Sequence, residues 1–278
     1  MKFHITTLSE NTVSRENLLA EWGISVLVET DDVNILLDTG LSISASYNAD
    51  ILGIDLGKID KIVLSHGHDD HTGGLRQILG KMRKEVEIIA HPDVWTDKYA
   101  HLGNGYRFTN IPFQHQELEK LGANFNLTPE PTRITDSIMT TGEVPMVTDF
   151  EKLEPDLYFV RTASGFKPDN LLDDQALIIN TELGLVVILG CAHHGIINTL
   201  YHAQQLTGVK PIYMVLGGCH LFNASKERIR LTIAALRELD VQRLGLCHCT
   251  GLPAAAIIAQ EFRDKFFFNN TGTTINLP

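Results

Sequence analysis

The sequence predicts a layered α/β protein, in which helices cover the faces of β-sheets. A short apolar strand followed by a polar loop and a helix occurs four times along the 278 residues. Strands that alternate with helices in this way are typical of layered α/β folds, which bind ligands where loops leave the carboxyl ends of strands. Seven of the twelve histidines lie in the four loops: His66, His68, His71, His193, His194, His220 and His248.

The first 90 residues are predicted to form a hairpin followed by a β-loop-α-β unit. Asp31 and Asp32 are turn residues between two apolar runs, and Thr39-Gly40 ends the second run. A loop rich in histidine and glycine then separates a strand from a segment with helical spacing. The expected elements are strands over 24–29, 34–38, 61–65 and 86–90 and a helix over 75–84.

The middle of the chain is less regular, and the C-terminal part repeats the strand-loop-helix pattern. Prolines interrupt short strand-like pieces between residues 92 and 165, where only one helix, near 114–121, is expected. We interpret 92–165 as an insertion or cap in a single domain spanning 1–278, because no linker or low-complexity tract divides the chain. The later elements are expected as strands over 175–180, 185–189, 212–216 and 243–246 and helices over 197–206, 226–239 and 253–262.

Composition excludes several classes of protein. A hydrophobic content of 44% with 21% charged residues is typical of a globular chain rather than a disordered or coiled-coil one. The net charge of −11 disfavours nucleic acid as a partner, since phosphate backbones are bound by clustered Lys and Arg. No apolar run is long enough for a membrane span, and the N-terminus does not resemble an export signal, so the cytoplasm is the expected location. The expected partner is a small-molecule substrate, and the oligomeric state is left open.

The sequence His66-Gly-His-Asp-Asp-His71 predicts a metal centre. His66 and His68 alternate beyond a strand end and can turn both imidazoles toward one point, while Asp70 and His71 can reach a second point nearby. Imidazole and carboxylate suit Zn²⁺, Mn²⁺ or Fe²⁺, and two such ions about 3.5–4 Å apart generate a hydroxide nucleophile near neutral pH. We therefore expect two metal ions per chain, with Zn²⁺ favoured.

Residues 65–74 resemble the HxHxDH signature of the metallo-β-lactamase superfamily. Other segments are similar to one branch of it, the metal-dependent hydrolases that include 7,8-dihydropterin-6-yl-methyl-4-(β-D-ribofuranosyl)aminobenzene 5′-phosphate synthase. The resemblance implies a four-layer αββα sandwich, the metallo-β-lactamase fold, with one or two metals. The segments are 10–11, 21–25, 35–40, 190–198, 217–221 and 248–251.

The resemblance also implies a set of ligands. His66 and His68 correspond to ligands of the first metal, and Asp70 and His71 to ligands of the second. His248, beyond the strand expected at 243–246, corresponds to the histidine that completes the second metal's shell.

The third ligand of the first metal stays open, because the middle of the sequence departs from the superfamily. Cys191 stands where a bridging aspartate is usual, and no histidine precedes Gln175 where one is common. His193 is our choice, because it lies just past the end of the strand, and Cys191 and Asp174 are alternatives. Cys191 can also be a small buried residue without a metal role.

Two further residues are predicted to support the site. His220 follows two glycines after a strand and is expected in the wall of the site, as a substrate contact or a partner of a ligand. Asp38, at the end of a strand, is expected to hold a ligating imidazole in one tautomer.

These features predict a metal-dependent hydrolase. A metal-bound hydroxide would attack a phosphoester or an ester- or lactone-type bond, with Asp70 as the catalytic residue that orients the nucleophile. The branch suggests a pterin- or phosphosugar-like substrate, although a shared fold does not fix the substrate. The alternative is a non-catalytic, metal-containing protein that binds or senses a ligand.

Overall fold

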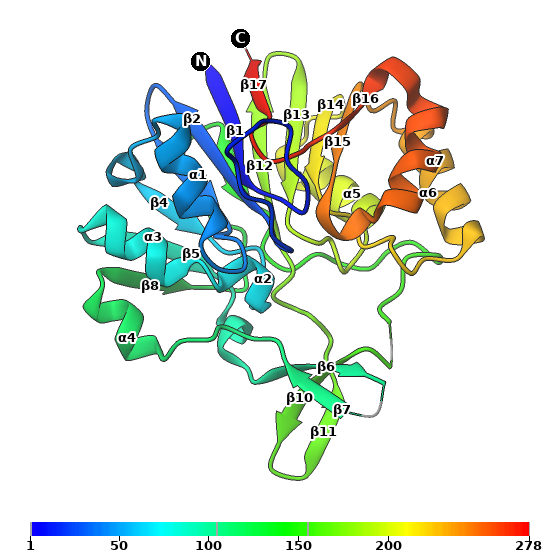
Figure 1. The fold of residues 1–278 in the computed structure, drawn as a ribbon. Helices are drawn as coiled ribbons and strands as arrows, with labels where there is room; N and C mark the ends of the chain where they lie inside the picture. Colours follow the sequence, from blue (N-terminus) through cyan, green and yellow to red (C-terminus); the bar gives the residue numbers. More distant parts are fainter. Residues whose placement is uncertain (1, 104, 155, 278) are drawn as a thin grey trace. The chain divides into compact units, whose positions relative to one another are not determined.

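The computed structural model describes residues 2–103, 105–154 and 156–277 (Figure 1). The chain divides into two compact units. The first unit comprises Met1–Pro129, Leu153–Asp173 and Asn270–Pro278, and the second unit comprises Glu130–Lys152 and Asp174–Asn269. Among the described residues, no helix combines the length and apolar character needed to cross a membrane.

The first unit is built on a mixed seven-stranded sheet with the order β17-β1-β2-β3-β4-β5-β8. Neighbouring strands pair in parallel from β3 to β8, and they pair antiparallel from β17 to β3. The strands are β1 (Phe3–Ser9), β2 (Ser25–Thr30), β3 (Asn34–Leu37), β4 (Lys61–Val63), β5 (Val86–Ala90), β8 (Ala123–Leu127) and β17 (Thr274–Leu277).

Helices cover one face of this sheet (Figure 1). Ala45 and Ala49 of α1 and Ile78 of α3 pack with Leu36 and Ile62 of the strands in one apolar core. This burial of apolar surface is the main stabilisation of the layer. The helical segments are α1 (Ser44–Leu52), α2 (Asp69–Thr72), α3 (Leu75–Met82) and α4 (His115–Lys120), with short 3₁₀ turns η1 (Leu56–Lys58) and η2 (Pro92–Trp95).

A second, four-stranded antiparallel sheet belongs to the same unit and has the order β11-β10-β6-β7. One of its faces carries the buried residues Lys98, Ala100 and Val160. Because side chains alternate along a strand, the opposite face carries Tyr99 and Phe159. The strands are β6 (Lys98–Leu102), β7 (Gly105–Phe108), β10 (Tyr158–Thr162) and β11 (Gly165–Pro168).

The second unit is built on a mixed six-stranded sheet with the order β16-β15-β14-β13-β12-β9. Strands β13 to β16 are parallel, and β12 is antiparallel to both of its neighbours. The strands are β9 (Ile138–Thr140), β12 (Ala176–Thr181), β13 (Gly184–Leu189), β14 (Ile212–Gly217), β15 (Arg243–Leu246) and β16 (Phe266–Phe268).

Three helices follow the parallel strands of this sheet and share its core. Leu200 of α5, Leu236 of α6 and Ile258 of α7 pack with Val187 and Val215 of the strands. The loops that carry the histidines therefore leave the carboxyl ends of adjacent strands. The helices are α5 (Ile196–Thr207), α6 (Lys226–Glu238) and α7 (Leu252–Phe262), with 3₁₀ turns η3 (His248–Thr250) and η4 (Arg263–Lys265).

The predicted helices and strands are all present within two residues of their expected bounds, and two of them end two residues early. The strand expected to reach Ser65 ends at Val63, and the Ser65 side chain instead turns to Asp38. The helix expected to reach residue 84 ends at Met82, because Arg83 adopts a left-handed conformation with φ of 51°. The sequence analysis did not predict β1, α1, β8, the four-stranded sheet, β16 or β17.

Candidate metal centre

The first group of predicted ligands lies in the loop between β4 and α3. His66, His68 and His71 are buried, with 0%, 4% and 0% of their surface exposed. His68 has extended backbone and precedes the four-residue helix α2, so the chain turns sharply between the second and third histidines. Two glycines follow this turn in a space without room for a side chain. A Cβ atom would lie 1.9 Å from the Leu41 carbonyl at Gly73 and 2.0 Å from the Thr39 carbonyl at Gly74.

This loop brings four predicted ligands together. His66 Nε2 and His68 Nδ1 are 2.9 Å apart, and the ring centroids of His66 and His71 are separated by 4.1 Å. His71 Nε2 lies 3.8 Å from the Asp70 carboxylate. The first unit alone therefore presents three imidazoles and one carboxylate at one place.

Asp38 contacts two residues of this loop through its carboxylate. Its backbone is in the left-handed region, with φ of 57°, and its carboxylate is fully buried. His71 Nδ1 and Ser65 Oγ both lie 2.6 Å from Asp38 Oδ2, and the Ser65 amide donates to Oδ1 over 2.7 Å. A proton on Nδ1 of His71, held by Asp38, leaves Nε2 with the lone pair that a metal requires.

The electrostatic environment keeps His68 neutral. Burial lowers the pKa of His68 to about 3, although the neighbouring Asp70 carboxylate favours the charged form. Neutral imidazole is the form that binds metal ions. At neutral pH His68 is therefore in the state required of a ligand.

The second group follows strands β13, β14 and β15 of the second unit. Ala192, His220 and His248 all have left-handed backbone, with φ of 50°, 45° and 52°. Such a conformation is costly for residues other than glycine, and it concentrates at functional sites, where the surrounding structure maintains it. The three strand-end loops are thus held in conformations that their residues would not adopt alone.

Sulfur is part of this second group. Cys191 Sγ lies 3.4 Å from His248 Nε2, and Cys249 adds a third donor, all three atoms lying within 4.8 Å of one another. A Cβ atom at Gly218 would lie only 2.5 Å from Cys249 Sγ, so glycine is needed there. The sequence analysis did not select Cys249, although its place in a Cys-His-Cys run after a strand was a usable signal.

The remaining predicted residues of the second unit have identifiable partners. The rings of His193 and His220 lie 4.3 Å apart, so the predicted third ligand and the predicted wall residue are neighbours. Asp174 Oδ2 accepts a hydrogen bond from the His194 amide over 2.9 Å, and His194 Nδ1 lies 2.6 Å from the Val144 carbonyl. The His194 ring therefore contacts a backbone carbonyl through Nδ1.

Cys219 differs from the two cysteines near His248. Burial raises the pKa of Cys219 to about 12, and its sulfur contacts the Thr250 hydroxyl at 3.3 Å. Among the described residues, Cys219 belongs to none of the groups of His, Cys, Asp and Glu that could hold a metal ion, so we assign it a structural role. The imidazole and carboxylate donors of the first unit and the imidazole and cysteine donors of the second unit are all ligand types that bind Zn²⁺.

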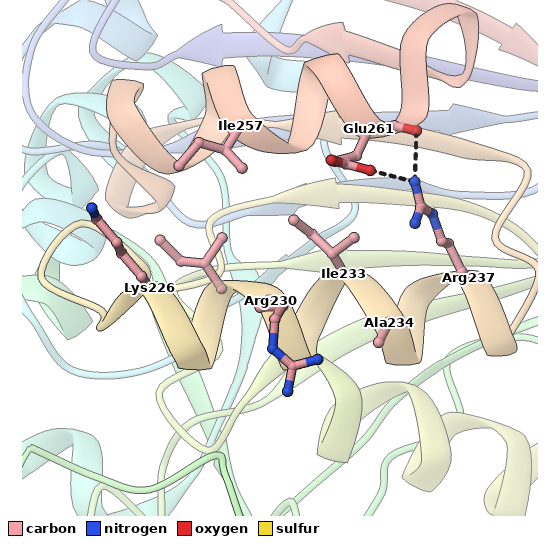
Figure 2. Close-up of a pocket in the computed structure, with 8 residues that line it drawn as sticks. Lys226, Arg230, Ile233, Ala234, Arg237, Ile257 and Glu261 are labelled. Atoms are coloured by element: carbon pink, nitrogen blue, oxygen red, sulfur yellow. Dashed lines mark hydrogen bonds and ion pairs between the residues drawn. The ribbon is translucent and has the colours of Figure 1, made fainter.

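A surface pocket between α6 and α7 contains none of the predicted ligands (Figure 2). Ile233 of α6 and Ile257 of α7 line it with apolar side chains, and Arg237 at one end is paired with Glu261. It offers no imidazole, thiol or unpaired carboxylate to a reacting group. The lining residues are Lys226, Ile229, Arg230, Ile233, Ala234, Arg237, Ile257 and Glu261.

Comparison with known proteins identifies the family. The model of the metallo-beta-lactamase superfamily matches residues 24–204. The chain belongs to the metallo-beta-lactamase superfamily. A superfamily relative from Methanocaldococcus jannaschii, 7,8-dihydropterin-6-methyl-4-(beta-D-ribofuranosyl)-aminobenzene-5'-phosphate synthase, is 33% identical over 94% of this chain and 92% of its own length. An uncharacterized protein of the same organism is 31% identical over 98% of this chain and 100% of its own length.

A solved structure extends the comparison of this metallo-beta-lactamase superfamily member. Tm1679, described as a metal-dependent hydrolase of the beta-lactamase superfamily, is 29% identical, with a TM-score of 0.83 over 98% of both chains. The predicted metallo-β-lactamase fold is confirmed as an α/β fold with two mixed sheets flanked by helices. The predicted enzyme class is confirmed by relatives that are a metal-dependent hydrolase and a synthase.

Proposed function

We propose that this chain is a metal-dependent hydrolase acting on a phosphoester or on an ester- or lactone-type bond of a small molecule. The main support for the proposal is the loop in which His66, His68, Asp70 and His71 lie close together and in which His71 contacts Asp38. The relative named as a pterin phosphate synthase makes pterin- and phosphosugar-like compounds the first substrates to test.

We further propose how the ligands are divided between two metal ions. His66 and His68 bind the first ion with His193, for which Cys191 and Asp174 are the alternatives. Asp70, His71 and His248 bind the second ion. Of these six ligands, four belong to the first unit and two to the second. This assignment requires the two units to act as one domain over 1–278, with 92–165 as its insertion or cap.

Residues of the chain have separate tasks in the proposed reaction. When bound, the metal ions supply a hydroxide nucleophile near neutral pH and polarise the acceptor oxygen of the substrate. Asp70 accepts a hydrogen bond from the attacking water and orients it. Asp38 holds the tautomer of His71, and His220 contacts the substrate or the neighbouring His193 in the wall of the site.

A substrate panel tests the proposed activity. The metal-loaded protein is assayed with a phosphodiester, a phosphomonoester, a lactone and a thioester, before and after treatment with a chelator. We expect hydrolysis of at least one class, loss of that activity with the chelator and its return with metal. Tight metal binding without turnover of any class would instead support the non-catalytic binding protein.

We expect two equivalents of Zn²⁺ per chain. The proposed assignment uses six ligands, which is more than the four that one Zn²⁺ ion usually binds. Elemental analysis of protein purified without chelator and then incubated with Zn²⁺, Mn²⁺ or Fe²⁺ measures both the number and the preferred ion. Metal content that never exceeds one equivalent would contradict the two-ion assignment.

If Cys191 rather than His193 supplies the third ligand, replacing Cys191 by serine is expected to weaken metal binding by about tenfold or more, because serine cannot supply a thiolate. Bound metal should also slow alkylation of Cys191 in the unsubstituted protein. The matched control is Cys219→Ser, since Cys219 is equally buried but bonded to Thr250. If Cys191→Ser and Cys219→Ser bind metal with the same affinity, Cys191 has only a packing role.

A further inference from the structure

Lys98 of β6 is a fully buried cation in the first unit. Only 1% of its surface is exposed, and its ammonium group donates to Asp169 Oδ2 and Asp173 Oδ1, each over 2.9 Å. A buried lysine is costly unless it is paired, so both carboxylates belong to one ionic group. The sequence analysis did not select Lys98, Asp169 or Asp173.

The second oxygen of Asp173 reaches the metal-binding loop. Asp173 Oδ2 accepts a hydrogen bond of 2.8 Å from the Gly67 amide, in the peptide that joins His66 to Gly67. A Cβ atom at Gly67 would lie 2.5 Å from Asn110 Oδ1 and 2.7 Å from the Val94 carbonyl. Gly67 is therefore closely packed, and its amide is held by the Asp173 carboxylate.

Charge strengthens this contact. Burial opposes the charged form of Lys98, but the Asp173 and Asp169 carboxylates raise its pKa above the usual value. Burial likewise opposes ionisation of Asp173, but the Lys98 charge dominates and lowers the pKa of that carboxyl. The bond from the Gly67 amide thus ends on a carboxylate, and bonds to ionised acceptors are shorter and stronger than neutral ones.

The same face of the four-stranded sheet also contacts His68 directly. The ring of Tyr158 stacks on the His68 ring, with centroids 4.7 Å apart and planes inclined by 29°. Tyr158 pairs with Ala100 and Val160 pairs with Lys98, so Tyr158 and Lys98 lie on one face of the β6-β10 pair. This sheet therefore restrains the loop at Gly67 and at His68.

We propose that Asp173, held by Lys98, is a positioning residue that aims the His66 and His68 imidazoles at the first metal. The inference rests on the proposed function, since it assigns these imidazoles to a metal. Partners of this kind behind metal ligands typically contribute about 10- to 100-fold in metal affinity. Asp173 does not itself bind the metal in this account.

The test compares the metal affinity of Asp173→Asn with that of Asp169→Asn. An asparagine at 173 has one acceptor oxygen, which can accept a hydrogen bond from either the Gly67 amide or the Lys98 ammonium. Its NH₂ group then faces the other donor, so one of the two hydrogen bonds is lost. Asp169 shares Lys98, and its other oxygen accepts from the Leu171 amide rather than from the metal-binding loop. We expect Kd for Co²⁺ to rise at least tenfold for Asp173→Asn, with a changed visible spectrum, and less than about threefold for Asp169→Asn.

Asp173→Glu provides a second variant that keeps the charge paired with Lys98 but displaces the acceptor by one methylene. It is also expected to raise Kd at least tenfold. Unchanged Kd in a folded Asp173 variant, or equal losses from Asp173→Asn and Asp169→Asn, would overturn the positioning role. Unsubstituted protein that binds no metal would contradict the proposed function itself, whereas unchanged Kd in a protein with metal-dependent turnover contradicts only this inference.

Discussion

Replacing Asp70 by asparagine is expected to lower kcat by about 10²- to 10³-fold with little change in KM. In the proposed function, the carboxylate supplies negative charge to the second metal position and accepts the hydrogen bond that orients the attacking water, and an amide would do neither. Both interactions matter mainly in the transition state, and comparable deletions cost about 3–4 kcal/mol of transition-state stabilisation. Steady-state kinetics on metal-saturated protein measure the effect without the contribution of a lost ion.

Asp69→Asn is the matched control for this prediction. Asp69 is adjacent in sequence, but its carboxylate pairs with the exposed Arg107 at 3.5 Å. Exposed pairs of this kind contribute little, so most activity should remain. Near-normal kcat for Asp70→Asn, or equal damage from both substitutions, would show that Asp70 is not the orienting carboxylate.

Asp38→Asn is expected to weaken metal binding by about 10- to 100-fold and to lower activity with it. Asparagine tolerates left-handed backbone, so the turn itself should be kept. Its NH₂ group must, however, face either the Ser65 amide or His71 Nδ1, both of which now bond to the carboxylate. In the second case the His71 proton moves to Nε2, and the lone pair that should bind metal is lost.

Isothermal titration with Zn²⁺ measures this loss, and the Tm of metal-free protein shows whether the fold is also affected. Ser65→Ala removes one hydroxyl donor to Asp38 but leaves the bond to His71, so it should weaken binding less than Asp38→Asn. Equal affinity for Asp38→Asn and unsubstituted protein would mean that the carboxylate does not control the tautomer.

The sequence was most informative where the site is local. His66, His68, Asp70 and His71 lie within six residues, so their spacing alone indicates that they can share a metal centre. The helices of the second unit could also be predicted from the sequence, because each follows an apolar strand and has an amphipathic pattern.

Other features depend on contacts that sequence spacing does not contain. Lys98 and Asp173 are separated by 75 residues, and no local spacing in the sequence indicates that they form an ion pair. All four residues of β11 are exposed, so that strand has no buried face to give the alternation that marks a strand. Cys249 lies beside Cys191 and His248, and the adjacent His248 has left-handed backbone, which a sequence pattern does not specify.

In the proposed function, the buried loop of residues 66–71 binds the metal required for hydrolysis. The most direct measurement is the return of Zn²⁺ to chelator-treated protein, with bound metal and turnover of the best panel substrate followed together. We predict that turnover rises with bound metal and saturates at two equivalents, and that His68→Ala stays at the background rate. Turnover that is unaffected by the chelator, or that is retained in full by His68→Ala, would contradict the account.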